Sequence, residues 1–304
     1  MKRFLVHSAI FLTLIMGSIA FVFFQADGYT DPFYIRFTTP KQNSLIIGTS
    51  KAAQGIRPAI LKTNLPEHSF FNYAFTVAHS PYGPAYLNGI KRKLSEDPKA
   101  GIFIVTVDGW SVSDGNQDPN DASQFDENYS FLNNLTNVSS KPNFGYLTTY
   151  YKNNYAKIFE RDTVAFLHDD GWLEISTRMS EEIVNTRIEN KAVSLAKKLE
   201  NNRLSYTRLK YLRKTITYLQ EHGKVYLVRL PVHPSLADAD AAVVPNFKEI
   251  MTQLANETGT AYLDMHSSND QFQYTDGIHL TKNSAADVSN RIGLWIKSNL
   301  QEKQ

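Results

Sequence analysis

The sequence predicts an α/β protein built on a doubly wound sheet of parallel strands. Short apolar, β-branched runs alternate along the chain with segments of helical periodicity, the order typical of parallel strands joined by helices. The run GIFIVTV, which begins at Gly101, is apolar without interruption, as expected of a strand buried on both faces. Ligands of such sheets bind beyond the carboxyl ends of the strands, so polar residues that follow a predicted strand are the first candidates for a site.

The first 24 residues are suited to a membrane. Two basic residues precede an apolar run from Phe4 to Phe24, and about 20 apolar residues are enough to span a bilayer as a helix. A basic start favours a cytoplasmic N-terminus. A cleaved signal peptide is the alternative, but the run ends in FVFFQ, which is bulky where a signal peptidase requires small residues. Both interpretations put the main domain outside the cytoplasm, in the periplasm or on the cell surface, and the first anchors it in the membrane.

After a polar connector at 25–42, residues 43–304 are expected to form the α/β domain. Strands are expected near 44–48, 70–75, 101–107, 223–230 and 261–263, and helices near 50–57, 82–94, 206–221, 246–257 and 282–300. Residues 112–200 interrupt the alternation, are rich in Asn, Asp, Ser and Tyr, and turn helical at 180–200. We expect them to form an insertion at the same edge of the sheet as the site. Its tyrosines have two interpretations, stacking on sugar rings or packing onto the main domain.

Composition excludes several classes of function. The net charge is +2, and Lys and Arg are spread along the chain, so no basic surface for nucleic acid is indicated. The chain has no cysteine, which excludes disulfides, thiolate metal sites and cysteine nucleophiles. We expect no cofactor.

One serine and one Asp-x-x-His segment together suggest nucleophilic catalysis. Ser50 follows a Gly-Thr turn at the end of the first predicted strand and starts a helix, so its own N–H can face a developing oxyanion. A serine hydroxyl needs a base, and His279 is the candidate, with Asp276 three residues earlier to orient it. A helix cap at Ser50 and an ordinary turn at 276–279 are the alternatives. The combination is harder to explain by chance, because one motif follows the first strand and the other precedes the last helix.

These two segments resemble the SGNH, or GDSL-like, hydrolase superfamily. LIIGTSKAAQGI is similar to its first block and YTDGIHLTKNSA to its last. The resemblance implies a three-layer, flavodoxin-like fold with Ser50 as nucleophile, His279 as general base and Asp276 as its orienting partner. It further implies a serine esterase or O-acyltransferase. The variant pattern resembles divergent members associated with bacterial cell-surface polysaccharides, so the implied partner is an acylated polysaccharide, with O-acetyl as the expected acyl group.

The resemblance is incomplete where the family places its oxyanion donors. A second-block glycine amide is one donor, but the matching stretch here, FFNYAFTVAHSPYG, offers Asn72 and the backbone N–H of Ala74 instead. The third block carries an asparagine, whereas strand three here ends in Asp108, whose ionised carboxylate would repel an oxyanion. Losing one such donor typically lowers turnover roughly 100- to 1000-fold. The alternative function is therefore a non-catalytic, SGNH-fold protein that binds or assembles polysaccharide.

Three further residues are candidate substrate-binding groups. Arg229 and His233 follow the fourth predicted strand, and Arg229 would bind an anion or a sugar hydroxyl unless it forms a structural ion pair. His79 follows the second strand and either lines the site or is an ordinary hydrogen-bonded histidine. His233 and His279 have no third ligand at convincing spacing, so no metal is expected.

Overall fold

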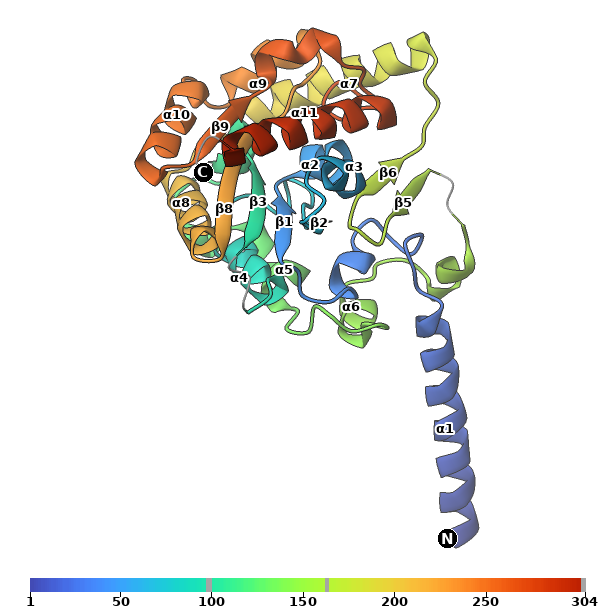
Figure 1. Ribbon diagram of the computed structural model, residues 1–304. Helices are drawn as coiled ribbons and strands as arrows, with labels where there is room; N and C mark the ends of the chain where they lie inside the picture. Colours follow the sequence, from blue (N-terminus) through green and yellow to red (C-terminus); the bar gives the residue numbers. More distant parts are fainter. Residues whose placement is uncertain (97–99, 162–163, 302–304) are drawn as a thin grey trace.

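A five-stranded parallel sheet forms the centre of the computed structural model, which describes residues 1–96, 100–161 and 164–301 (Figure 1). The strand order is β2-β1-β3-β8-β9, and each neighbouring pair is parallel. The strands are β1 (Ser44–Ile47), β2 (Phe70–Asn72), β3 (Gly101–Thr106), β8 (Gly223–Arg229) and β9 (Ala261–Asp264). Because the chain moves outward from β1 in both directions, the sheet is doubly wound and flavodoxin-like, which confirms the predicted fold class.

Helices flank the sheet in two layers. Helix α11 contacts both α2 and α3 in one layer, and α8 contacts both α4 and α10 in the other (Figure 1). Their bounds are α2 (Ser50–Gly55), α3 (Pro58–Asn64), α4 (Pro84–Lys93), α8 (Tyr206–Gln220), α10 (Phe247–Thr258) and α11 (Lys282–Gln301). The second strand is shorter than predicted and ends at Asn72, although Tyr73 and Phe75 still donate backbone hydrogen bonds to Ile46 and Gly48.

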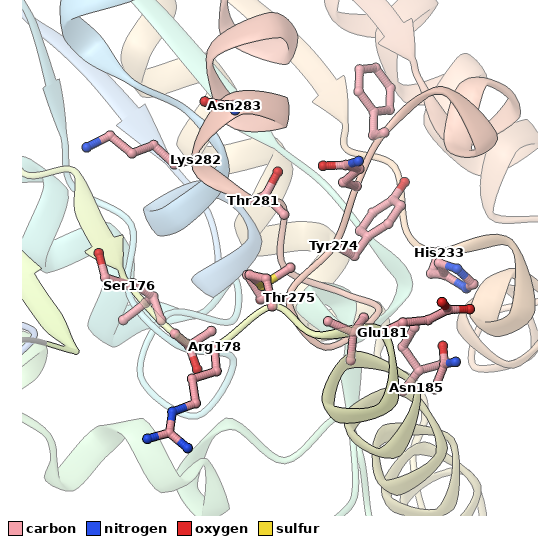
Figure 2. A pocket seen from close by; sticks show the side chains of 17 residues that line it. Ser176, Arg178, Glu181, Asn185, His233, Tyr274, Thr275, Thr281, Lys282 and Asn283 are labelled. Carbon is pink, nitrogen blue, oxygen red and sulfur yellow. The ribbon is translucent and has the colours of Figure 1, made fainter.

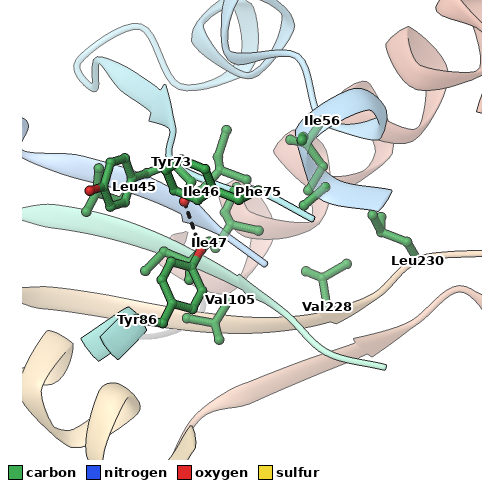
Figure 3. Packing of buried hydrophobic residues seen from close by; sticks show 14 of the residues in the cluster. Leu45, Ile46, Ile47, Ile56, Tyr73, Phe75, Tyr86, Val105, Val228 and Leu230 are labelled. Atoms are coloured by element: carbon green, nitrogen blue, oxygen red, sulfur yellow. Dashed lines mark hydrogen bonds between the residues drawn. The ribbon is translucent and has the colours of Figure 1, made fainter. Parts of the chain in front are cut away.

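The sheet is apolar on both faces because both are covered. Every residue of β1 and of β3 is buried. Ile46, Val105 and Val228, from three adjacent strands, lie in the same part of this core (Figure 3). Complete burial of one such side chain stabilises the fold by roughly 1.5–3 kcal/mol. The carboxyl ends of these strands therefore rest on a close-packed core.

The turn that follows β1 is held from two sides. The Gly48 N–H donates to the Tyr86 hydroxyl at 2.9 Å, and this hydroxyl donates to the Tyr73 carbonyl at 2.8 Å, the bond drawn in Figure 3. Gly48 has φ +151°, and a Cβ there would lie 1.8 Å from Thr106 Oγ1. Only glycine lets the ends of β1 and β3 approach this closely. The segment that begins with Ser50 therefore leaves the sheet at a defined point.

The segment between β3 and α8 forms a unit of its own beside the sheet. It begins at β4 (Ser113–Asp114) and ends at β7 (Arg203–Leu204), and these two strands pair antiparallel, near the predicted limits of the insertion. Between them lie α5 (Phe131–Asn134), α6 (Phe144–Thr149), the antiparallel pair β5 (Ala165–Leu167) and β6 (Leu173–Ile175), and α7 (Glu181–Leu199). Tyr146 and Tyr151 are buried, so these tyrosines pack the insertion onto the protein.

The N-terminal helix α1 (Lys2–Phe24) projects from the domain (Figure 1). Among the described residues it alone is long and apolar enough to cross a membrane. The expected connector at 25–42 is part of the folded domain. Arg36 is fully buried and donates to the carbonyl oxygens of Asn72 and Gly171, which ties this segment to β2 and to the insertion.

Candidate active site

The three residues predicted from the two motifs form a continuous hydrogen-bonded line. Ser50 Oγ lies 2.9 Å from His279 Nε2, and His279 Nδ1 lies 2.9 Å from Asp276 Oδ2. With the proton on Nδ1, the Ser50 hydroxyl donates to Nε2 and Nδ1–H donates to the carboxylate. Ser50 begins α2, and the other two residues lie in the turn before α11. Because α2 packs against α11, residues 229 positions apart in the chain meet at the carboxyl end of the sheet.

The Asp276 turn is built to present His279. Asp276 Oδ1 accepts the backbone N–H groups of Ile278, at 3.1 Å, and of His279, at 3.0 Å. The Thr275 N–H donates to the His279 carbonyl at 2.8 Å, which closes the turn. Gly277 has φ +91°, and a Cβ there would lie 2.5 Å from Leu236 Cδ1. A side chain at 277 would therefore be strained as well as crowded.

The Asp276 carboxyl group is ionised at neutral pH. Burial by itself would raise its pKa. The hydrogen bond and charge of His279, together with the Lys191 ammonium, outweigh burial and hold the pKa of Asp276 well below its usual range. Lys191 belongs to α7, and its Nζ lies 3.1 Å from Asp276 Oδ2. No local motif in the sequence marks Lys191 as a site residue.

Ser50 does not act as a helix cap. Thr49 occupies the N-cap of α2, and Ser50 is the first helical residue, so its hydroxyl is left to meet His279. Its N–H lies in the first turn, where the helix supplies no carbonyl acceptor. The side chain is half-buried, so it is within reach of solvent.

Asp108 is held by groups that compensate its charge. Its Oδ1 accepts the Ser111 N–H at 2.8 Å, and the Ser111 hydroxyl meets the Asp108 N–H at 3.1 Å, so the two residues cap each other. Oδ2 accepts the Thr49 hydroxyl at 3.3 Å and lies 3.6 Å from Lys51 Nζ. The carboxylate predicted to repel an oxyanion therefore has two hydrogen-bond donors and one ammonium as neighbours.

Lys51 and Arg229 belong to one buried ion cluster. Lys51 Nζ lies 2.7 Å from Asp240 Oδ1, and burial of the ammonium is outweighed by Asp240 and Asp108, so the pKa of Lys51 is raised. Arg229 lies 3.7 Å from Asp240 and 3.8 Å from Asp264. Its guanidinium also packs over the Phe247 ring at 5.0 Å. Arg229 thus forms the structural ion pairs that were the alternative to a ligand-binding role.

Asn72 and Ala74 are buried beneath the site, and His79 packs against the insertion. Asn72 Nδ2 donates to the carbonyls of Ala52 and Ile56, both at 2.9 Å, and so holds the end of α2. Its Oδ1 accepts the Ala74 N–H at 3.2 Å, so the amide considered as an oxyanion donor already has a partner, and Ala74 is fully buried. The His79 ring stacks on Phe131 at 4.8 Å, and its Nδ1 meets Thr76 Oγ1 at 2.6 Å.

His233 lies beside the Asp276 turn, where its backbone N–H donates to the Gly277 carbonyl at 2.7 Å. Its ring lines a groove of about 890 Å³ between α7 and the segment that carries the turn (Figure 2). Thr275 and Thr281, which flank the turn, also line this groove, whereas Ser50 and His279 do not. Within 1–96, 100–161 and 164–301, no three His, Cys, Asp or Glu side chains are arranged to hold a metal ion.

Fold and site together define a class: a doubly wound α/β protein with a Ser–His–Asp line at the carboxyl end of its sheet. No protein-family model matches the chain, and no curated protein sequence matches it. Among solved structures, the chain is similar to a lipase/acylhydrolase from Enterococcus faecalis, at 11% identity and a TM-score of 0.40, over 84% of this chain and 96% of that one.

Two further solved structures are similar to the chain. One is Est24, a carbohydrate acetylesterase from Sinorhizobium meliloti, at 10% identity and a TM-score of 0.40, over 84% of this chain and 98% of that one. The other is Est2A, an acetyl xylan esterase from Butyrivibrio proteoclasticus, at 9% identity and a TM-score of 0.31, over 87% of this chain and 65% of that one.

Proposed function

We propose that the protein is a serine-dependent esterase or O-acyltransferase that works through an acyl-enzyme on Ser50. The observation that carries this proposal is the Ser50–His279–Asp276 line, with both of its hydrogen bonds at 2.9 Å. A nucleophile, a base within hydrogen-bond reach and a third group that orients the base are the parts that acyl transfer requires.

The proposed reaction proceeds in two halves. Ser50 Oγ attacks the carbonyl carbon of an ester while its proton passes to His279 Nε2, and Asp276 stabilises the resulting imidazolium. The tetrahedral intermediate collapses, the C–O bond to the alcohol breaks, and His279 returns the proton to the departing alkoxide. Water or a sugar hydroxyl then attacks the acyl-Ser50 ester by the same route in reverse. Water completes hydrolysis, and a sugar hydroxyl completes transfer.

The Ser50 N–H is the proposed donor to the oxyanion, since it is free of helical acceptors and adjoins the reacting hydroxyl. The case for a non-catalytic protein depended on Asp108 and on the missing third-block asparagine. Against that alternative, Asp108 Oδ1 is bound to the Ser111 N–H, and Oδ2 faces Thr49 and Lys51. The negative charge at this position is thus compensated by neighbours.

The proposed substrate is an O-acetylated polysaccharide outside the cytoplasm, and α1 is proposed to anchor the enzyme in the membrane. Asn185 and Thr281 line the groove beside the Asp276 turn (Figure 2), and Gln273 and the apolar side chain of Ile188 line it as well. Amide and hydroxyl groups beside apolar surface suit the hydroxyls and the ring faces of sugars.

Acetate release tests the proposal. The full chain in detergent micelles should release acetate from an aryl acetate and from acetylated xylan used as a probe polymer. Ser50→Ala should lose both activities while its circular dichroism spectrum stays that of the wild type. Asn185→Ala should raise KM for the polymer and leave the aryl acetate unaffected. Undiminished activity in the Ser50→Ala variant would remove the assigned nucleophile, and equal effects of Asn185→Ala on both substrates would remove the groove from the proposal.

A further inference from the structure

Lys191 and His279 contact the same oxygen of the same carboxylate. Lys191 Nζ lies 3.1 Å from Asp276 Oδ2, and His279 Nδ1 lies 2.9 Å from that atom. Lys191 reaches this position from α7, which belongs to the insertion. Helix α7 is held close to the turn, since a Cβ on Gly277 would lie 3.3 Å from Ile188 Cγ1. The insertion therefore contributes the Lys191 ammonium to the Ser50–His279–Asp276 line, whose three residues belong to the core of the fold.

A cation at this place opposes what the carboxylate does for the base. The negative charge of Asp276 stabilises the imidazolium, whereas an ammonium on the same oxygen offsets part of that charge and repels a second positive charge. The side chains are only 27% exposed for Lys191, 20% for Asp276 and 13% for His279, so solvent screens them incompletely.

Two other lysines on the elements beside this turn pair with carboxylates elsewhere. Lys51 of α2 pairs with Asp240, and Lys282 at the start of α11 pairs with Glu174, both at less than 3 Å. On the other side, His233 Nδ1 meets Ser235 Oγ at 2.7 Å. Among the residues that the structure describes, the ion pairs of Asp276 are those with His279 and Lys191.

We propose that Lys191 is a positioning residue of the reaction. It holds the Asp276 carboxylate, and its charge extends to lower pH the range in which His279 can act as the base. This inference rests on the proposed function. Removing the ammonium leaves Asp276 free to stabilise the imidazolium more strongly. The acid limb of kcat/KM should then move to higher pH, by about 0.5 to 1 pH unit for a partly exposed charge at this distance.

The variants are Lys191→Met, Lys191→Arg and, as a control for charge on the same helix, Lys197→Met, which changes an exposed residue more than a turn further along α7. The first readout is the pH profile of kcat/KM for an aryl acetate. The second is NMR titration of His279 in the full chain with 13Cε1-labelled histidine, which is practical because the chain has eight histidines.

Lys191→Met should raise both midpoints, while Lys191→Arg and Lys197→Met should keep the wild-type midpoints. A His279 midpoint that stays in place or falls in Lys191→Met would overturn the inference, whatever happens to turnover. The NMR titration needs no ester turnover. A wild type without esterase activity would therefore end the proposed function and still leave this inference to be decided.

A second and independent feature is the aromatic surface at the end of α1. Phe23 of α1 is buried against the insertion, with ring centroids 5.5 Å from Phe144 and 5.2 Å from Tyr155. Phe144 and Tyr155 nevertheless remain partly exposed, at 47% and 42%, and Phe159 of the insertion is 54% exposed. Figure 1 shows α6 near the upper end of α1, on the same side of the domain.

The geometry points to a bilayer interface as the partner of Phe144, Tyr155 and Phe159. A helix of 23 residues is about 34 Å long, close to the thickness of a hydrocarbon core of roughly 30 Å. When α1 spans the membrane, Phe23 lies at its outer surface. Residues packed on Phe23 then lie at the level of the headgroups, where aromatic rings are favoured. This surface would orient the domain on the membrane.

The absence of cysteine makes spin labelling direct. Single cysteines replace Phe159, Leu14 in the middle of α1, and Leu294, which is exposed on α11. Power-saturation EPR in phosphatidylcholine vesicles then compares oxygen and nickel-chelate access. The label at Leu14→Cys should show the access expected in the hydrocarbon core, that at Phe159→Cys the access expected at the membrane interface, and that at Leu294→Cys the access expected in water. If the label at 159 is as accessible to the nickel chelate as the label at 294, the proposed membrane contact of Phe144, Tyr155 and Phe159 is wrong. A Leu14 label in water overturns both the anchor and the surface.

Discussion

Lys51 directly follows Ser50 in the chain, and its ammonium lies 3.6 Å from the Asp108 carboxylate. Both side chains are less than 10% exposed. The same ammonium lies 2.7 Å from Asp240. Isolated charges are costly in a protein interior, so each member of a buried ion cluster depends on its partners. The residue that departs most from the SGNH pattern, Asp108, is thus accompanied by a buried lysine that compensates its charge.

Lys51→Met should destabilise the protein by about 3–5 kcal/mol, because Asp240 and Asp108 would lose their nearest ammonium. Urea unfolding followed by circular dichroism measures this change. The double variant Lys51→Met/Asp240→Asn removes one charge of each sign and should recover part of the lost stability. Equal stability of the two variants would argue that Lys51 and Asp240 do not interact as an ion pair.

Asp108→Asn should change the turnover of an aryl acetate less than about tenfold in either direction. The reason is that the side chain at this position is already engaged as the acceptor of the Ser111 N–H. An amide oxygen can accept the same hydrogen bond. A gain of about 100-fold would instead mean that the native carboxylate repels the oxyanion.

Gly277→Ala should lower activity, because the residue has φ +91° and its new methyl group would lie 2.5 Å from Leu236 Cδ1. The shift of the turn would displace His279 from Ser50. Gly259→Ala is the matched control, since Gly259 also has positive φ (+64°) but no atom within 4 Å of a Cβ. Both variants should lose about 1 kcal/mol or more of stability through backbone strain. Only Gly277→Ala should lose kcat, and equal kcat in the two variants would contradict the role of the turn.

Lys93 should make stability depend on pH. Burial lowers the pKa of Lys93 to about 7, and its acceptors are uncharged oxygen atoms of Thr39 and Val138. Between this value and the ordinary lysine pKa of about 10.4, the unfolded chain binds more protons than the folded one, so the free energy of unfolding rises with pH. Urea unfolding between pH 7.5 and 9 should show this rise in the wild type and a smaller one in Lys93→Met. Parallel slopes would contradict it.

The sequence predicted the fold because each strand and helix carries a local pattern, and α8 and α11 begin at the predicted residues, Tyr206 and Lys282. Ser50 and His279 were selected for the same reason, since each lies in a short motif of its own. Lys51 and Lys191 were not, because their partners, Asp240 and Asp276, are far away in the chain and no local pattern links them.

The candidate oxyanion donors show a different limit of sequence analysis. Whether the Ala74 N–H is free depends on the rotamer of Asn72, whose amide oxygen accepts it. The role of Arg229 likewise depends on Asp240 and Asp264, which come from separate elements. Side-chain partners of this kind are set by tertiary packing. The position of a residue after a strand predicts that it lies near the site, and packing decides what it binds.

Covalent labelling tests the central proposal most directly. The full chain, in detergent at neutral pH, is treated with a fluorophosphonate probe, and the labelled peptide is identified by mass spectrometry. A Ser50 hydroxyl activated by His279 should be labelled at Ser50 alone, and His279→Gln should slow labelling by about 1000-fold or more. Absence of label on Ser50 in the folded wild type, or labelling at an equal rate in His279→Gln, would contradict the proposed nucleophile and base.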